Sequence, residues 1–255
     1  MRGILSVLHS DTEVLAALES DSAKIIAAPP SYPFLIALKA QQRPILVVTS
    51  SSRSAEDLAE SLRDLHARVY EFPAWETLPH ERLSPRSDTV AQRIATLYSL
   101  QLSDDIHPVV VAPVRAVIHR FIASLATQPL WTLEIGQEIG LTELITHLTE
   151  LAFTRTDLVE KRGEFAVRGS IMDLFPMGSD RPYRIELFDD EVESLRKFSP
   201  DTQISNDKVD AIRLLPGREY PLHPQAIASF RQAFREVFAV DVTMLEEDRG
   251  RGATR

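Results

Sequence analysis

Apolar and polar residues alternate in blocks along roughly the first 120 residues of the chain. Short apolar runs at residues 24–28, 44–50 and 107–112 predict strands that are buried in a sheet. Between these runs apolar residues recur at helical spacing, and Ser54 is expected to cap one of the helices. Strands and helices that alternate in this way are typical of a parallel α/β sheet with helices packed against it.

From about Leu130 the pattern is different. A helix is predicted at residues 141–151, and it is followed by three extended stretches at 163–175, 182–198 and 209–215. Extended stretches that follow one another with turn residues between them predict an antiparallel sheet. This part of the chain is therefore expected to form a small α+β domain.

The sequence thus predicts a protein of the α/β class with two compact units, the usual division for a chain of 255 residues. The first is a parallel α/β domain at residues 1–124, and the second is the α+β domain at 125–205, inserted into the first. Residues 206–255 are expected to return to the first domain. They include an amphipathic helix whose apolar face carries Ile227, Phe230, Phe234 and Phe238.

Composition narrows the possible functions. Apolar residues make up 44% of the chain and charged residues 25%, which is ordinary globular usage and argues against a membrane protein. The net charge of −9 disfavours tight nucleic-acid binding by this chain alone, since phosphate binding is largely electrostatic. The chain has no cysteine and its seven histidines lack metal-ligand spacing, so we expect no metal. The first residues lack the features of a signal peptide, which favours a cytoplasmic protein.

A parallel α/β sheet suggests a nucleotide-binding fold, but the residues that would hold phosphate are missing. A phosphate-binding loop needs glycines, so that backbone N–H groups can surround the phosphate, and a lysine. The chain has no glycine between Gly3 and Gly136, and Pro29 and Pro30, which lack an N–H, follow the first apolar run. We therefore expect a degenerate domain of the P-loop type that binds no ATP or other cofactor.

The acidic run Asp189–Asp190–Glu191 is the remaining candidate for catalysis. Three adjacent carboxylates could hold Mg²⁺ for phosphoryl transfer. The run lies between two extended stretches, however, where a hairpin turn or a bulge with solvated carboxylates is expected. We favour the turn, and we expect no enzymatic activity from this chain.

The extended stretch at 182–188 has a polar face that could bind another protein. Strand alternation places Arg184, Glu186 and Phe188 together on this face, and it places Arg168 on the less apolar face of the preceding strand. An aromatic residue flanked by an arginine and a glutamate is the composition of an interaction hot spot. An alternative of similar weight is that a helix covers Phe188 and that Arg184 pairs internally with Glu186 or another nearby acid.

Two long blocks of sequence are specific enough to compare with known families. They read RGEFAVRGSIMDLFPMGSDRPYRIELFDDEVESLRKFSPDTQ at 162–203 and FPAWETLPHERLSPRSDTVAQRIATLYSL at 72–100. Both resemble blocks of the transcription-repair coupling factor family, in a module that is similar to the excision-repair protein UvrB. The resemblance implies that the α+β domain binds UvrA, the damage-recognition ATPase. The family's UvrA-contacting residues correspond here to Arg168, Arg184 and Phe188, with Glu186 as a peripheral member.

The resemblance also implies what this module lacks and what surrounds it. The family lost here the ATP site that UvrB keeps, so the first domain is expected to be a degenerate RecA-like domain. A full coupling factor continues into an RNA-polymerase-binding domain and an ATP-dependent translocase on duplex DNA. The chain is therefore expected to be an N-terminal fragment that recruits UvrA to a stalled polymerase, and whose UvrA-binding face is masked by the far C-terminal domain of the intact protein.

Two alternatives stay open at this point. A UvrB-like DNA-dependent ATPase would need an unconventional nucleotide site, because the phosphate loop is missing. A duplex-DNA-binding module would need a local basic patch on this acidic chain. The candidates for that patch are Arg82, Arg86 and Arg93.

Overall fold

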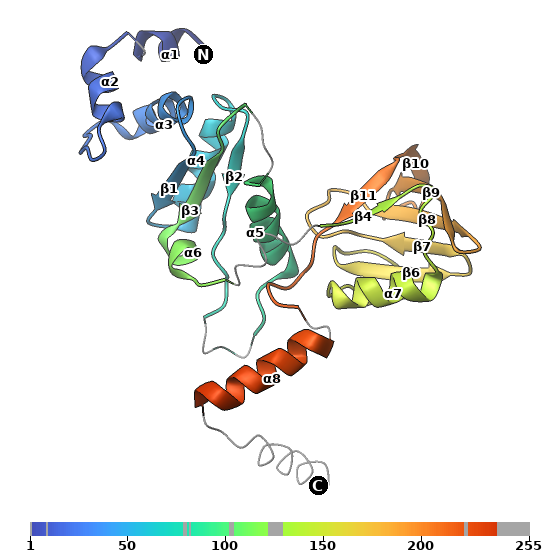
Figure 1. Cartoon of the computed structure of the whole chain (residues 1–255). Helices are drawn as coiled ribbons and strands as arrows, with labels where there is room; N and C mark the ends of the chain where they lie inside the picture. Colours follow the sequence, from blue (N-terminus) through green and yellow to red (C-terminus); the bar gives the residue numbers. More distant parts are fainter. Residues whose placement is uncertain are drawn as a thin grey trace.

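The computed structural model describes residues 2–8, 10–78, 81, 83–101, 105–121, 130–221 and 224–238. Figure 1 shows two folded units side by side and a separate helix below them. We call the described residues up to 121 the α/β unit, and residues 130–221 the sheet unit. The elements of the α/β unit are α1 (Arg2–Leu8), α2 (Thr12–Glu19), the short 3₁₀ helix η1 (Pro29–Ser31), α3 (Tyr32–Ala40), β1 (Ile45–Thr49), α4 (Ser52–Arg63), β2 (Val69–Glu71), α5 (Ser87–Ser99), β3 (Val109–Pro113) and α6 (Val114–Ile118).

The α/β unit is built on a three-stranded parallel sheet in the order β1-β3-β2. The central strand β3 is buried along its whole length, as expected for a parallel strand that is covered on both faces. Val109 and Val111 pack with α3 and α4, whereas Val110 and Ala112 pack with residues of α5 and α6. The parallel α/β sheet predicted for this part of the chain is confirmed.

Two local predictions for the α/β unit were wrong. Residues 24–28 form neither a helix nor a strand, and Ile26 is 88% exposed. A strand needs a neighbour to satisfy its backbone hydrogen bonds, and among the described residues the sheet ends at β1. The residue that caps α4 is Ser51 and not Ser54, because the Ser51 Oγ accepts a hydrogen bond from the Ser54 N–H at 3.1 Å.

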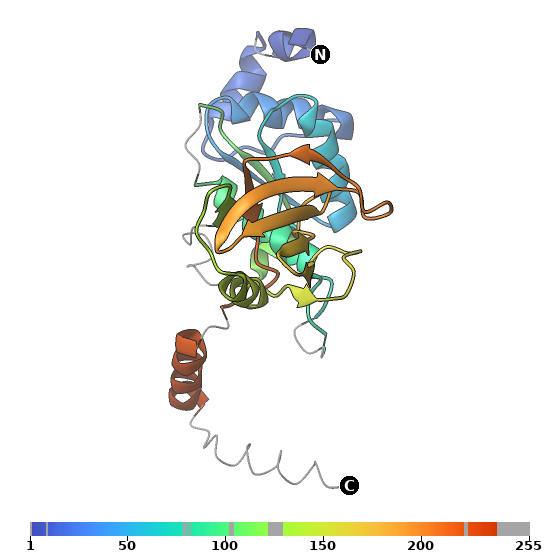
Figure 2. The ribbon, with the colours of Figure 1, turned by 90° about the vertical axis from the view of Figure 1, so that its right-hand side faces the viewer.

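The sheet unit contains a six-stranded sheet in the order β10-β9-β8-β7-β6-β5. All pairs are antiparallel except β5 with β6, which confirms the predicted antiparallel sheet. Figure 2 views the molecule from the side of this unit and shows the curvature of the sheet. Its elements are β4 (Trp131–Glu134), α7 (Leu141–Glu150), β5 (Thr154–Arg155), β6 (Glu164–Arg168), β7 (Ile171–Leu174), β8 (Tyr183–Phe188), β9 (Glu191–Phe198), β10 (Ser205–Lys208) and β11 (Ala211–Leu214).

Asp189 and Asp190 of the acidic run form the turn of the hairpin between β8 and β9, and Glu191 begins β9. Asp189 has a positive φ of 51°, a conformation that aspartate adopts more readily than most residues. The carbonyl of Asp190 accepts the Ile139 N–H at 2.6 Å, so the turn also holds the segment before α7. The predicted hairpin turn is thus confirmed. Across the described part of the chain, no three acidic or histidine side chains gather into a group that could hold a metal ion.

One face of the six-stranded sheet is covered, and we call it the inner face. Leu144 and Leu148 of α7, with residues of the two-stranded sheet of β4 and β11, pack against it. The apolar alternation predicted for β6 and β8 is confirmed, because their inner residues belong to this core. The sheet residues in the core include Phe165, Met172, Leu174, Ile185, Leu187, Val192 and Leu195.

The predicted domain boundaries stay predictions. Strand β10 begins at the boundary expected at 205 and β11 lies beyond it, and these strands pair with β9 and β4 of the sheet unit. The boundary expected at 124 falls on residues 122–129, outside the described residues. The amphipathic helix of the last segment is present as α8 (Pro224–Phe238), with Phe230 68% exposed.

Helix α5 lies between the two units and packs into both. Ala91 is fully buried in the core of the sheet unit, and Val90 and Ile94 pack against Leu215 of the same unit. Leu97, one turn further along, packs with the core of the α/β unit. The two units therefore share this helix.

A buried ion pair adds to this junction. Arg93 of α5 is fully buried and pairs through Nε with Glu219. Its Nη1 donates to the Pro73 carbonyl at 2.8 Å, and its guanidinium lies 4.1 Å from the ring centroid of Phe72. The Trp75 indole N–H donates to the same Glu219 carboxylate at 3.0 Å. Arg93 is thus unable to contact DNA.

The candidate basic patch is therefore wrong for Arg93. Of the other two residues, Arg86 is exposed, and Arg82 lies outside the described residues. A fully buried arginine has to be paired, since an isolated charge away from water is costly. The pairing with Glu219 comes from a segment 126 residues away, which alternation and charge counts do not reveal.

Candidate docking face on the antiparallel sheet

Strand register places the four predicted contact residues on the outer face of the six-stranded sheet, opposite α7. Arg168, Ile171, Glu186 and Ser194 lie opposite one another in one row across four strands. Residues opposite one another in antiparallel strands point to the same side of the sheet. We call this surface the docking face, and its residues are Arg168, Ile171, Asp173, Arg184, Glu186, Phe188, Ser194 and Arg196.

Arg184 is the most constrained cation of the docking face. Its guanidinium forms a bidentate pair with Asp173, with Nε donating to Oδ1 at 2.7 Å and Nη2 donating to Oδ2 at 2.9 Å. It also lies over the ring of Phe198, at 5.0 Å from the centroid. The hydrogen bond to Asp173 raises the pKa of Arg184 above its ordinary value, against the opposing effect of burial, and the charges of Asp173 and Glu186 add to the rise. Arg184 is therefore positively charged at any working pH.

Glu186 lies beside Arg184 and is also held by neighbours. Its Oε2 accepts a hydrogen bond from the Ser194 hydroxyl at 2.6 Å, and the Arg196 Nη2 lies 3.7 Å from the same oxygen. Both side chains of this ion pair are about one third exposed, so the pair stabilises the fold only weakly. Its effect is to orient the Glu186 carboxylate on the face.

Phe188 is the exposed aromatic of the docking face. It is 68% exposed, so neither α7 nor another described element covers it. It lies two residues beyond Glu186 on β8, just before the hairpin turn. An aromatic ring left in water next to oriented charges is the arrangement that a protein partner can cover.

Arg168 is exposed at the end of β6, and among the described residues its side chain makes one hydrogen bond, from Nη2 to the Asp157 carbonyl at 3.1 Å. It lies in the same row as Glu186 but two strands away. Because neighbouring strands are about 4.8 Å apart, the two backbones are separated by roughly 10 Å. A partner that contacts both residues therefore needs a broad complementary surface, which a single small ligand does not have.

The sequence analysis placed Arg184, Glu186 and Phe188 on one face of their strand and Arg168 on the less apolar face of the preceding strand. The structure brings these two faces together on the outer side of the sheet. The sequence left two interpretations open, an exposed interaction hot spot and a face that is covered and internally paired. Phe188 is not covered by a helix, in agreement with the first, whereas Arg184 pairs internally, in agreement with the second. The partner of Arg184 is Asp173 and not Glu186. The sequence does contain a signal for this pairing, which is Asp173 inside the otherwise apolar strand β7. A carboxylate at such a position requires a cation.

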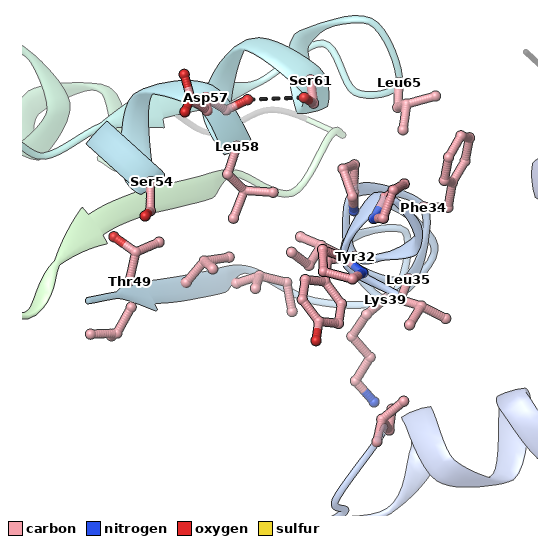
Figure 3. A pocket seen from close by; sticks show the side chains of 18 of the residues that line it. Tyr32, Phe34, Leu35, Lys39, Thr49, Ser54, Asp57, Leu58, Ser61 and Leu65 are labelled. Carbon is pink, nitrogen blue, oxygen red and sulfur yellow. Dashed lines mark hydrogen bonds between the residues drawn. The ribbon is translucent and has the colours of Figure 1, made fainter. Parts of the chain in front are cut away.

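A groove in the α/β unit is the place where the ATPase alternative would need its site. It lies between α3, β1 and α4, has a volume of about 1020 Å³ and is lined mostly by apolar side chains (Figure 3). Lys39 extends away from the hydroxyl groups of Thr49 and Ser54. Pro29 and Pro30, which also line the groove, have no N–H to donate. The described residues thus offer an apolar surface without a phosphate cradle.

Fold and face together define an α/β protein with a helix-backed antiparallel sheet. Its other side carries a small buried cluster around Phe198 and, beside this cluster, exposed charged and aromatic residues. The sequence model of the UvrB interaction domain family matches residues 131–220, which is the sheet unit. The transcription-repair-coupling factors of Mycobacterium tuberculosis and Escherichia coli are 42% and 37% identical to the chain over 192 and 195 residues. That of Bacillus subtilis is 30% identical over 213 residues.

These matches cover 72%, 73% and 81% of the chain, respectively. They place the chain among the homologues of the transcription-repair-coupling factors and confirm the resemblance inferred from the sequence. The chain spans only 16%, 17% and 18% of the length of these relatives. No helix in the described ranges has both the length and the apolar content needed to cross a membrane.

Proposed function

We propose that the sheet unit binds UvrA through the docking face, and that it thereby brings nucleotide excision repair to an RNA polymerase stalled at a lesion. The observation that supports this most is Phe188, a large apolar side chain that is 68% exposed among oriented charges. The family match of the sheet unit and the names of the relatives agree with a role in coupling transcription to repair.

In this proposal the chain supplies binding and no covalent chemistry. The α/β unit serves as a scaffold that holds the sheet unit through α5. RNA polymerase and duplex DNA are partners of the parent protein, and its far C-terminal domain masks the docking face until UvrA is needed. The apolar groove beside α3 disfavours the ATPase alternative, and ATP turnover by the purified chain would contradict the proposal.

The test is a titration of purified UvrA into the chain by calorimetry, with Phe188→Ala alongside. Losing a central aromatic anchor is expected to weaken binding by about 2 kcal/mol or more. The matched control is Ile118→Ala in α6, which removes a side chain that is 71% exposed on the other unit and is expected to leave the affinity unchanged. No saturable binding by the folded wild type would refute the proposal, and equal affinity of the Phe188 variant would remove the site.

A further inference from the structure

One residue of the docking face is a buried carboxylate. Asp173 is on β7, between β6 and β8, and is 3% exposed. A carboxylate this far from water is costly unless it is paired and hydrogen-bonded. Within the described residues its ion pair is with Arg184, which approaches it from the opposite position on β8. Each of the two side chains therefore holds the other in place.

This pairing fixes how Arg184 is presented. A guanidinium has five N–H donors, and Asp173 takes the Nε–H and one N–H of Nη2. The Nη1 atom lies 3.3 Å from the Gln203 carbonyl and 3.4 Å from the Ser205 hydroxyl, so the turn before β10 holds the remaining side of the group. One N–H of Nη2 is left without an acceptor among the described residues. The side chain is 19% exposed, so part of it is open to a partner.

Arg168 differs from Arg184 in this respect. It makes one hydrogen bond to a backbone carbonyl and is exposed. Its guanidinium can rotate to suit a bound partner, whereas that of Arg184 is set before binding. Charged groups that are fixed in advance lose less conformational entropy on binding.

We propose that Asp173 is a positioning residue of the docking face, which holds Arg184 in the orientation that UvrA recognises. This rests on the proposed function, because UvrA is the partner in question. Asp173 itself is only 3% exposed, so its effect on a partner is expected to act through Arg184. Its removal is expected to weaken UvrA binding through Arg184 alone.

The experiment is a double-mutant cycle on UvrA affinity, with calorimetric titrations of the wild type, Asp173→Asn, Arg184→Ala and the double variant. Asp173→Asn is expected to weaken binding at least tenfold in the wild-type background and less than twofold in the Arg184→Ala background, because no guanidinium then remains to be positioned. The control is Asp180→Asn, an exposed acid in the turn before β8, which is expected to leave the affinity within twofold.

A second variant keeps the test decisive if Asp173→Asn folds poorly by circular dichroism. Arg184→Lys keeps a cation for Asp173 but lacks the planar guanidinium with its fixed N–H directions. This variant is therefore expected to fold, and to bind UvrA at least tenfold more weakly than the wild type does. A loss of equal size in both backgrounds would show that Asp173 acts on the fold alone, and this would overturn the inference, as would full affinity of Asp173→Asn or Arg184→Lys. Absence of binding by the wild type would instead overturn the proposed function itself.

Discussion

At the scale of single residues, the docking face holds two arginines that differ in freedom. Arg184 is tied to Asp173 by two hydrogen bonds, whereas Arg168 is exposed with one hydrogen bond to a backbone carbonyl. A free guanidinium can bind a partner carboxylate with two parallel N–H groups, which an ammonium cannot do. The two positions should therefore respond differently to conservative substitution.

We expect Arg168→Lys to weaken UvrA binding about tenfold, or about 1.4 kcal/mol, because lysine keeps the charge but lacks the two parallel N–H donors of the guanidinium. The free energy of unfolding should change by less than about 0.5 kcal/mol, because the side chain is exposed. Calorimetric titration and urea denaturation measure the two quantities. The control is Arg155→Lys on β5, also exposed, with no change expected in either. Unchanged affinity of the Arg168→Lys variant would mean that a point charge suffices.

What the sequence can predict at this scale follows from the period of a strand. Alternation needs no distant information, so the common side of Arg184, Glu186 and Phe188 was predictable. The pairing with Asp173 depends on the register of β7 against β8, and register is set by turns and by the whole core. The exposure of Phe188 depends on which face α7 covers, and both faces were possible from the sequence.

At the scale of elements, α5 is the helix on which the arrangement of the two units depends. Ile94 is 2% exposed and packs against Leu215 of the sheet unit. Truncation to alanine leaves a cavity, so Ile94→Ala is expected to lower the free energy of unfolding by about 2 to 5 kcal/mol. Urea denaturation followed by tryptophan fluorescence measures it, with Gln92→Ala, at an exposed position of the same helix, as the control. A cost below about 1 kcal/mol would show that the junction repacks.

The mispredicted strand at 24–28 has a clear physical cause. The apolar runs at 24–28 and 107–112 look alike in sequence, but only the second has strands on both sides. A strand is stabilised by its neighbours, and a local pattern carries no information about them. The extended stretch that forms β11 was predicted correctly, but a local pattern could not reveal its pairing with β4, which comes about 80 residues earlier. Helices such as α7 were predictable because their hydrogen bonds are local.

At the scale of the whole molecule, the two units are joined by polar as well as apolar contacts. The Arg93–Glu219 pair connects α5 to the segment after β11, and the Trp75 indole N–H shares the carboxylate. Arg213, on β11, lies over the ring of Tyr98 at 5.5 Å from the centroid, and Arg162 approaches Asp88 at 3.6 Å. We therefore expect the chain to unfold in a single transition, with the docking face held in a fixed direction relative to the α/β unit.

The buried pair allows a direct measurement of this coupling. Glu219→Gln keeps an acceptor for the Trp75 N–H but leaves Arg93 as an uncompensated buried charge, so it is expected to cost about 3 to 5 kcal/mol of unfolding free energy. Adding Arg93→Met removes that charge, and the double variant should recover much of the loss. As a control, Asp57→Asn breaks the exposed Arg53–Asp57 pair, whose side chains are 82% and 59% exposed, and should cost at most about 0.5 kcal/mol.

Urea denaturation is measured for the wild type, Glu219→Gln, the double variant and the Asp57→Asn control. UvrA titration of the folded variants adds a second measurement. If the pair acts only at the junction, the double variant binds UvrA as the wild type does, because Arg93 and Glu219 lie outside the docking face. If the single and double variants are equally unstable, the charge of Arg93 is not what makes the single loss costly, and its contacts with Phe72 and Pro73 carry the stability instead. Two separate unfolding transitions in the single variant alone would show that this pair is what makes the two units unfold together.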